Sequence, residues 1–344
     1  MPMHSSLVVF FAPLLIGLSP LQACVGDDPT SARIDAPPDA GAAPQPDAGA
    51  ATPIDAGGPT DAADGLSVAV AGLNRPTVLL QDGSRVYIAA ADGVHMWADG
   101  DSMASLLYDT PGPARGMARV PGGPLFVHAD DSLYLLERKN ETTTAIKCAA
   151  TLVQSFARLG SQILYGTSTG LRKTAAGPVC EHDNTPATDN PEGAPSPLYA
   201  DATALYRYRE TEFGSIVACT DPENCGDTTT VIRTAVGKVE ALLADDDRVY
   251  WSTASAVFSS PKAGGSVTTL ADEQPRPRAM AVSGGTLYWT TDGGTLMVAE
   301  VGKQGTARVV AGNLKRPSGL IVTANHVLVS ETERGRIVRI PRVQ

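Results

Sequence analysis

Seven near-repeats, spaced about 40 residues apart, run through most of this 344-residue chain. Each is anchored on an apolar residue followed by Tyr or an apolar equivalent, inside a short β-rich run. The anchors are Val86-Tyr87, Leu125-Phe126, Leu164-Tyr165, Leu205-Tyr206, Val249-Tyr250, Leu287-Tyr288 and Val327-Leu328. Their second members are separated by 39, 39, 41, 44, 38 and 40 residues. A repeat of this length is typical of one four-stranded blade of a β-propeller.

The sixth repeat shows how one period divides into strands. β-rich runs are expected at 278–282, 286–290, 295–301 and 307–311, and the turns between them carry Gly, Asn or Asp. Helical periodicity is not evident after residue 65. The sequence therefore predicts an all-β chain.

The two ends of the repeat region match each other. Residues 68–76 (VAVAGLNRP) parallel residues 309–317 (VVAGNLKRP), and the seventh repeat, 318–342, has room for only three strands. We expect residues 66–71 to complete the last blade and close the ring, because closure removes exposed strand edges. The prediction is seven four-stranded blades. Six is the alternative, if the irregular fourth repeat is not a full blade.

Two repeats carry a recognisable motif. Residues 287–292 (LYWTTD), followed by Gly-Thr-Leu and then by 316–320 (RPSGL), resemble a YWTD-type propeller repeat. Residues 249–253 (VYWST) are a second copy. The similarity extends to bacterial secreted and lipoprotein β-propellers. The resemblance implies a propeller fold in an exported protein and names no partner.

The N-terminus reads as an export signal. Residues 7–18 are almost wholly apolar but too short to span a bilayer, as in a signal-peptide core. They lead to Leu21-Gln22-Ala23-Cys24, which resembles a bacterial lipobox. We expect a lipoprotein signal over 1–24, with Cys24 lipidated, and a location at the bacterial envelope on the periplasmic or cell-surface side. The alternative is an ordinary cleaved signal.

Residues 25–65 are of low complexity. Ala, Pro, Asp and Gly make up 32 of these 41 residues, and the segment carries a charge of −7. It has too few large apolar residues to offset the entropy of ordering, so we expect a disordered linker. The propeller, 66–344, then carries −10 − (−7) = −3. This charge leaves no basic footprint for a nucleic acid.

Four cysteines lie beyond Cys24. Cys219 and Cys225 bracket a turn-rich stretch between two β-like runs, so a disulfide across this hairpin is expected. Cys148 and Cys180 would form a second disulfide between repeats two and three. A zinc site is the alternative, although only His182 beside Cys180 lies at ligand spacing.

Charged positions recur in the repeats. Twelve residues before the anchors lie Arg75, Lys238, Arg276 and Arg316, and four to five residues after them lie Asp92, Asp130, Asp292 and Glu333. In a propeller these two sets of loops share one face. That face would offer a polar docking surface for a protein, peptide or glycan. The alternative is a set of exposed turn charges that pair weakly.

No sequence motif for catalysis is evident, and no Gly-rich phosphate loop occurs. We therefore expect a monomeric envelope protein that works as a binding or scaffolding module without a cofactor; calcium has no support in the sequence. One alternative is a propeller hydrolase or lactonase with a metal in the central channel, and another is a structural envelope protein with no discrete ligand. Converging Asp, Glu or Asn side chains in the channel would favour that enzyme, and small apolar residues would favour the binding module.

Overall fold

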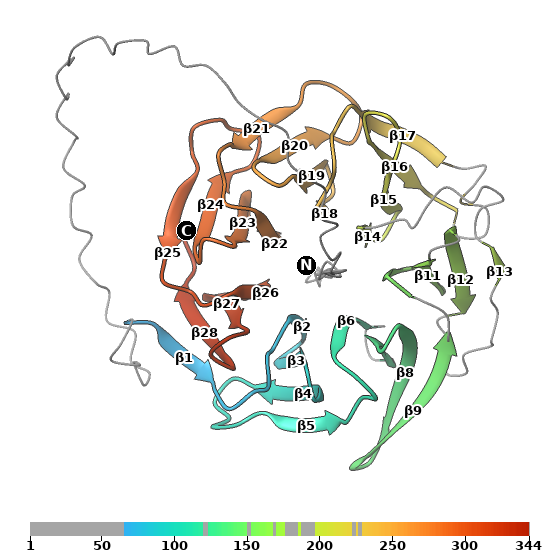
Figure 1. Ribbon diagram of the computed structural model, residues 1–344, viewed down its shortest axis with the longest axis vertical. Helices are drawn as coiled ribbons and strands as arrows, with labels where there is room; N and C mark the ends of the chain where they lie inside the picture. Colours follow the sequence, from blue (N-terminus) through green and yellow to red (C-terminus); the bar gives the residue numbers. More distant parts are fainter. Residues whose placement is uncertain are drawn as a thin grey trace, which may run out of the picture. The chain divides into compact units, whose positions relative to one another are not determined.

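The computed structural model describes residues 65–119, 123–149, 153–167, 170–175, 185–186, 197–221, 225 and 229–343. These residues form seven four-stranded antiparallel sheets and no helix, and the sheets follow one another around a ring (Figure 1). The predicted seven-bladed β-propeller is confirmed. The fourth repeat is a full blade, so the six-bladed alternative is wrong. The signal at 1–24 and nearly all of the 25–65 linker lie outside the described residues and stay predictions.

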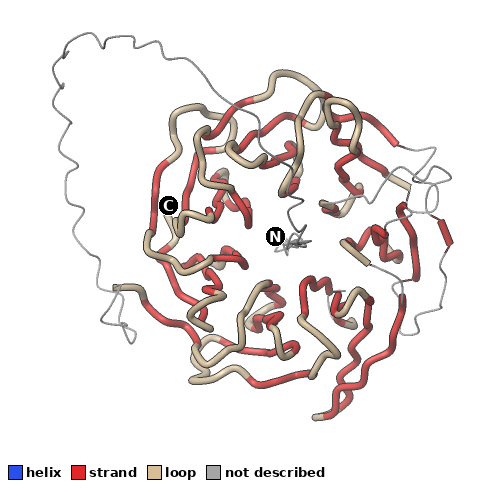
Figure 2. The backbone as a smooth tube through the Cα atoms, viewed as in Figure 1, coloured by secondary structure: helices blue, strands red, loops and turns tan. Residues whose placement is uncertain are grey.

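In blades 1 to 6 the strands run in sequence order from the ring centre outward, and in blade 7 β26, β27 and β28 do so while β1 forms the outer strand (Figures 1 and 2). Blade 1 comprises β2 (Val78–Asp82), β3 (Arg85–Ala90), β4 (Gly93–Ala98) and β5 (Ser105–Tyr108). Blade 2 comprises β6 (Ala114–Arg119), β7 (Leu125–Ala129), β8 (Ser132–Lys139) and β9 (Thr142–Ala149). Blade 3 comprises β10 (Ser155–Leu159), β11 (Gln162–Thr167), β12 (Gly170–Ala175) and β13 (Thr185–Pro186). Blade 4 comprises β14 (Leu198–Ala200), β15 (Leu205–Arg209), β16 (Ser215–Cys219) and β17 (Thr229–Thr234).

The remaining blades include the one that closes the ring. Blade 5 comprises β18 (Ala241–Ala244), β19 (Arg248–Ser252), β20 (Val257–Pro261) and β21 (Thr268–Ala271). Blade 6 comprises β22 (Pro277–Ser283), β23 (Thr286–Thr291), β24 (Leu296–Glu300) and β25 (Arg308–Ala311). Blade 7 comprises β26 (Pro317–Val322), β27 (His326–Glu331), β28 (Arg336–Pro341) and β1 (Ser67–Val70).

The N-terminal strand closes the ring as predicted. β1 pairs antiparallel with β28, with Ser67 opposite Arg339 and Val68 opposite Val338. The last blade is therefore built from both ends of the repeat region. None of the described residues lies in a helix with the length and apolar character needed to cross a bilayer.

The propeller has two distinct faces, which we name by their loops. The entry face holds the loops that lead into the inner strands and the turns between second and third strands. These segments meet: Ala91 N donates to Asn74 O at 2.7 Å, and Asp292 N donates to Pro275 O at 2.8 Å. The exit face holds the turns between first and second strands and those between third and fourth strands.

Glycine permits the close packing of entry-face segments. Leu314 N, in the loop leaving blade 6, donates to Gly294 O at 3.0 Å, and Leu73 N donates to Gly335 O at 2.9 Å. A Cβ on Gly294 would lie 2.4 Å from the carbonyl oxygen of Leu314, and φ at this glycine is +77°. Only glycine fits such a backbone approach at positive φ without strain.

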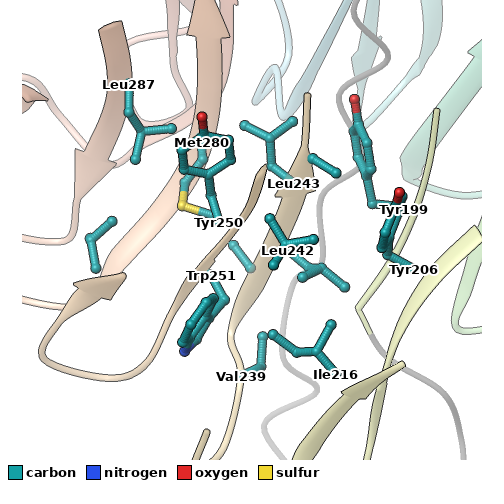
Figure 3. Packing of buried hydrophobic residues seen from close by; sticks show 14 of the residues in the cluster. Tyr199, Tyr206, Ile216, Val239, Leu242, Leu243, Tyr250, Trp251, Met280 and Leu287 are labelled. Carbon is teal, nitrogen blue, oxygen red and sulfur yellow. The ribbon is translucent and has the colours of Figure 1, made fainter. Parts of the chain in front are cut away.

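The anchor aromatics fill the spaces between blades. Tyr250, Tyr288 and Trp289 are fully buried, and Trp251 is 2% exposed. Tyr250 and Trp251 lie in an apolar cluster that joins blades 4, 5 and 6 (Figure 3). These rings are therefore part of the packing between blades.

Candidate functional site

Four of the predicted docking residues are exposed on the entry face. Arg75, Lys238 and Arg316 lie in loops that lead into inner strands, and Glu333 lies in the turn between β27 and β28. Among the described residues, none of these four has a salt-bridge partner. They are available to a ligand, and their role in docking stays a prediction.

Two more predicted residues are already paired. Arg276 lies 3.4 Å from Glu240, and Asp292 accepts two hydrogen bonds from the Arg278 guanidinium, at 2.7 and 2.9 Å. A β-bulge between Pro277 and Met280 displaces the start of β22, and Arg278, within the bulge, pairs with Asp292. Pairs as exposed as these contribute little free energy, so they fit the alternative of locally paired turn charges.

The remaining acidic positions lie in the turns of blades 1 and 2. Asp92 lies 3.0 Å from His95 Nε2, and Asp131, beside Asp130, lies 3.9 Å from Arg115. Asp130 is exposed and adopts a φ of 46°. The entry face thus carries both signs of charge, with part of the charge neutralised within the face.

The hairpin disulfide is confirmed. Cys219 and Cys225 are bonded, with their Cα atoms 5.2 Å apart, in the exit-face loop between β16 and β17. This bond removes the zinc alternative for these two residues. Cys148, buried on β9, is also disulfide-bonded, and its predicted partner Cys180 lies outside the described residues, as does Cys24.

The inner strands offer little to a channel metal. Asp82 is the only carboxylate in the seven inner strands, and it lies 2.7 Å from Arg119 Nε. In the part of the chain that the structure describes, no three His, Cys, Asp or Glu side chains gather as a metal site. These residues therefore provide no metal site that would support the alternative of a hydrolase or lactonase in the channel.

An open cleft lies on the exit face between blades 1 and 2. Its volume is about 670 Å³, and its floor is formed by Tyr87, Met96 and Leu107 of blade 1 and Leu125 and Leu136 of blade 2. These residues belong to the apolar cluster between the two blades or pack against it. The floor is therefore the solvent end of the inter-blade core.

A long hairpin forms one wall of the cleft. β8 and β9 have eight residues each, the longest of the described strands, and Lys139 pairs with Thr142 at their tip. The turn requires a positive φ, which Asn140 supplies at 59°. In Figure 1 this hairpin projects at the edge of the ring, and the same protrusion is visible in Figure 2. The third and fourth strands of blade 2 are thus longer than those of the other described blades, and they are longer at the side of the cleft.

Basic side chains surround the apolar floor. Arg85, Arg119, Arg138 and Lys139 line the cleft, and the only carboxylate among its lining residues is Glu137. Four cations against one anion give the lining +3, and Asp82, which pairs with Arg119, reduces this to +2, whereas the whole chain carries −10. Such a concentration of positive charge attracts anionic ligands.

The four basic residues have different structural roles. Arg119 donates to Tyr87 Oη at 2.6 Å and lies over the Tyr87 ring, 4.9 Å from its centroid, besides pairing with Asp82. It therefore joins the two blades. Lys139 is 84% exposed and lies 3.4 Å from Glu137. Arg85 and Arg138 are exposed and have no carboxylate partner among the described residues, so both can bind a ligand.

The sequence did not predict this cleft. Its basic residues come from two repeats and are 54 residues apart at the widest, from Arg85 to Lys139 (139 − 85 = 54). The signal that could have indicated it is the charged run at 137–139 within an unusually long β-rich stretch. No other third strand among the described blades carries three consecutive charged residues.

Three solved structures with the same fold are informative. The extracellular domain assigned to a hybrid two-component system of B. thetaiotaomicron aligns with a TM-score of 0.65 at 13% identity. The match covers 81% of this chain and 40% of that one, so this chain spans well under half of its length. The Pan2 WD40 domain of Neurospora crassa gives 0.60 at 12% identity, with coverages of 79% and 90%. Virginiamycin B lyase of Staphylococcus aureus gives 0.59 at 13% identity, with coverages of 78% and 96%.

These likenesses establish the fold alone. No protein-family model matches the chain, and no curated protein sequence matches it. The structures that share the fold include an extracellular domain, a WD40 domain and a lyase, so the fold is compatible with unrelated functions. The function of this chain therefore depends on its own surface.

Proposed function

We propose that this chain is an exported ligand-binding module in which a rigid β-propeller presents the cleft between blades 1 and 2 to an envelope partner. The cleft carries the proposal. Its volume of about 670 Å³ lies within the range of about 300–1,000 Å³ typical of ligand sites. It combines an apolar floor with a few polar side chains at the rim, which is the usual composition of a binding site.

The scaffold suits binding without covalent chemistry. The closed ring fixes both walls of the cleft, because Arg119 of blade 2 pairs with Asp82 and hydrogen-bonds Tyr87 of blade 1. A wall held in place loses little entropy when a ligand binds, and this favours affinity. Among the described residues that line the cleft, none is a nucleophile paired with a base.

Site-specific photo-crosslinking tests this function. A photoreactive residue replaces Thr143, which lines the cleft, and a matched control replaces Val309, which is 55% exposed on blade 6. Both proteins are irradiated in intact cells, and the adducts are identified by mass spectrometry. An adduct with one defined partner at Thr143 and none at Val309 is expected. Equal adducts at both positions, or none at Thr143, would contradict the proposal.

We also propose that Cys24 carries a lipid and that residues 25–65 tether the propeller to the membrane. The apolar segment at 7–18 and the Leu21–Cys24 motif support this placement. A tether raises the effective concentration of the domain near membrane-bound partners. Mass spectrometry of the mature N-terminal peptide should detect a lipidated Cys24, and Cys24→Ser should release the protein from the membrane fraction. An unmodified N-terminus elsewhere in the chain would refute the anchor.

A further inference from the structure

We infer that the cleft between blades 1 and 2 recognises an extended acidic peptide segment whose carboxylates bind Arg85 and Arg138. This inference rests on the proposed binding function and names the chemical class of the partner. Lys139, at the hairpin tip, adds a third cation to the same rim.

Unused charge at this rim borders an apolar floor, whereas Arg75, Lys238 and Arg316 of the entry face, unpaired among the described residues, do not line this cleft. On the entry face, Arg276 and Arg278 are engaged with Glu240 and Asp292. In the cleft, Arg138 contacts only the sulfur of Met96, at 3.5 Å, among the interactions of the described residues. A guanidinium binds a carboxylate through two parallel hydrogen bonds, and such charge-assisted pairs are stronger than neutral ones.

The floor of the cleft favours a ligand that also carries apolar groups. Met96 and Leu107 are half-buried side chains that pack against the inter-blade core and line the cleft. A ligand that covers them gains free energy by removing apolar surface from water. The complementary partner carries carboxylates next to apolar groups, as a segment of alternating acidic and apolar residues does.

The aromatic content favours a peptide over an acidic glycan. Tyr87 is the only aromatic side chain among the lining residues, and it is 3% exposed. Arg119 covers its ring at 4.9 Å. The cleft therefore presents no free ring on which a sugar could stack.

The outer strand of the hairpin favours an extended conformation of the peptide. β9 is an outer strand that pairs with β8 and with no other described strand. Its eight residues compare with four in β5 and β21. An exposed edge of this length can accept an added strand through main-chain hydrogen bonds. Thr143 places the start of this edge at the cleft.

Fluorescence anisotropy with the full chain tests the inference. The probe is a labelled peptide of alternating Leu and Glu, and the matched control peptide carries Gln in place of Glu. Arg85→Ala and Arg138→Ala should each weaken binding of the Glu peptide about tenfold, which is about 1.4 kcal/mol. Arg308→Ala and Arg342→Ala remove the same charge from positions outside the cleft and outside the predicted docking face, and should change affinity less than twofold. Thermal unfolding verifies that all four variants are folded.

The outcomes separate this inference from the proposed function. Equal weakening by the cleft variants and the control variants, or equal binding of the Glu and Gln peptides, would overturn the acidic-peptide inference. An oligogalacturonate that binds through Arg138 while the Glu peptide does not would also overturn it and leave the cleft as a ligand site. If photo-crosslinking at Thr143 also yields no partner, the proposed function fails as well.

Discussion

An ion pair across the exit face joins blades 4 and 5, and its removal is expected to weaken the ring. Asp201 Oδ2 accepts a hydrogen bond from Lys262 Nζ at 2.6 Å, while Oδ1 accepts from the backbone N–H groups of Thr203 and Ala204 at 2.7 and 2.9 Å. Lys262 also lies over the Tyr206 ring, 4.9 Å from its centroid. One carboxylate thus fixes a turn of blade 4 and holds a cation of blade 5.

The expected free energy follows from burial. The side chains of Asp201 and Lys262 are 15% and 18% exposed, so water screens the pair less than an exposed one. A hydrogen bond to a charged group contributes about 1.5–3 kcal/mol, and exposed pairs contribute about 0.2–1 kcal/mol. We expect a coupling energy of about 1.5 kcal/mol between the two residues, which corresponds to a melting shift of about 3–6 °C.

A double-mutant cycle measures this coupling. Asp201→Asn keeps an amide oxygen for the turn, and Lys262→Met keeps the aliphatic length without the charge. Urea unfolding of both single variants and of the double variant at neutral pH gives the coupling energy. A coupling below about 0.3 kcal/mol would refute the reasoning, because that is the usual scatter for independent sites.

The pH dependence gives a second test of the same pair. Burial alone would raise the pKa of the Asp201 carboxyl, but hydrogen bonds from Lys262 and Thr203 outweigh it and hold this pKa below its usual value. A carboxylate with a lowered folded-state pKa stabilises fully above its unfolded pKa and loses that contribution as pH falls through the folded one. The coupling should therefore persist at pH 7 and vanish in strong acid. A coupling that is unchanged there would contradict an ionic origin.

Three further changes test the fold. Serine at both Cys219 and Cys225 should lower the free energy of unfolding by about 2 kcal/mol, since the closed loop is short, and non-reduced peptide mapping should show the bond. Gly294→Ala should destabilise by more than about 2 kcal/mol in thermal unfolding, because its Cβ would clash with a carbonyl oxygen, whereas Gly305→Ala, at a similar φ in open space, should cost about 1 kcal/mol. Burial, followed by the Arg115 charge, lowers the pKa of His128 to about 4. The free energy of unfolding, measured with urea, should therefore fall by about 3 kcal/mol as the pH drops from 6.5 to 4. His128→Gln should abolish this loss.

Much of the fold could be predicted because it is repeated and local. The 38–44-residue period set the blades, and the match between residues 68–76 and 309–317 set the closure by β1. The disulfide between Cys219 and Cys225 follows from a short loop between two strands. Each of these features depends on residues that are close in sequence or on a pattern that recurs.

Pairing between side chains could not be predicted in this way. The residue twelve positions before the anchor Tyr288 is Arg276. The ion pair with Asp292 is instead made by Arg278, which lies in the bulge at the start of β22. Likewise, Arg119 joins Asp82 and Tyr87 from a different repeat. Such contacts depend on backbone irregularities and on packing between blades, which a count along the chain does not contain.

Features that recur from blade to blade belong to the scaffold of this propeller, and a feature that occurs once is a candidate for function. Arg75, Arg276 and Arg316 each precede a proline and adopt φ values of 50°, 53° and 53°, so they repeat one backbone solution for entering an inner strand. Because this conformation recurs in three blades, it is explained by the backbone path into the inner strand and does not require a ligand. A hairpin of two eight-residue strands, β8 and β9, occurs once among the described blades, and ring closure does not require its length. Because the repeat explains the scaffold, the departure from it at the basic cleft is where selection for a ligand is best sought.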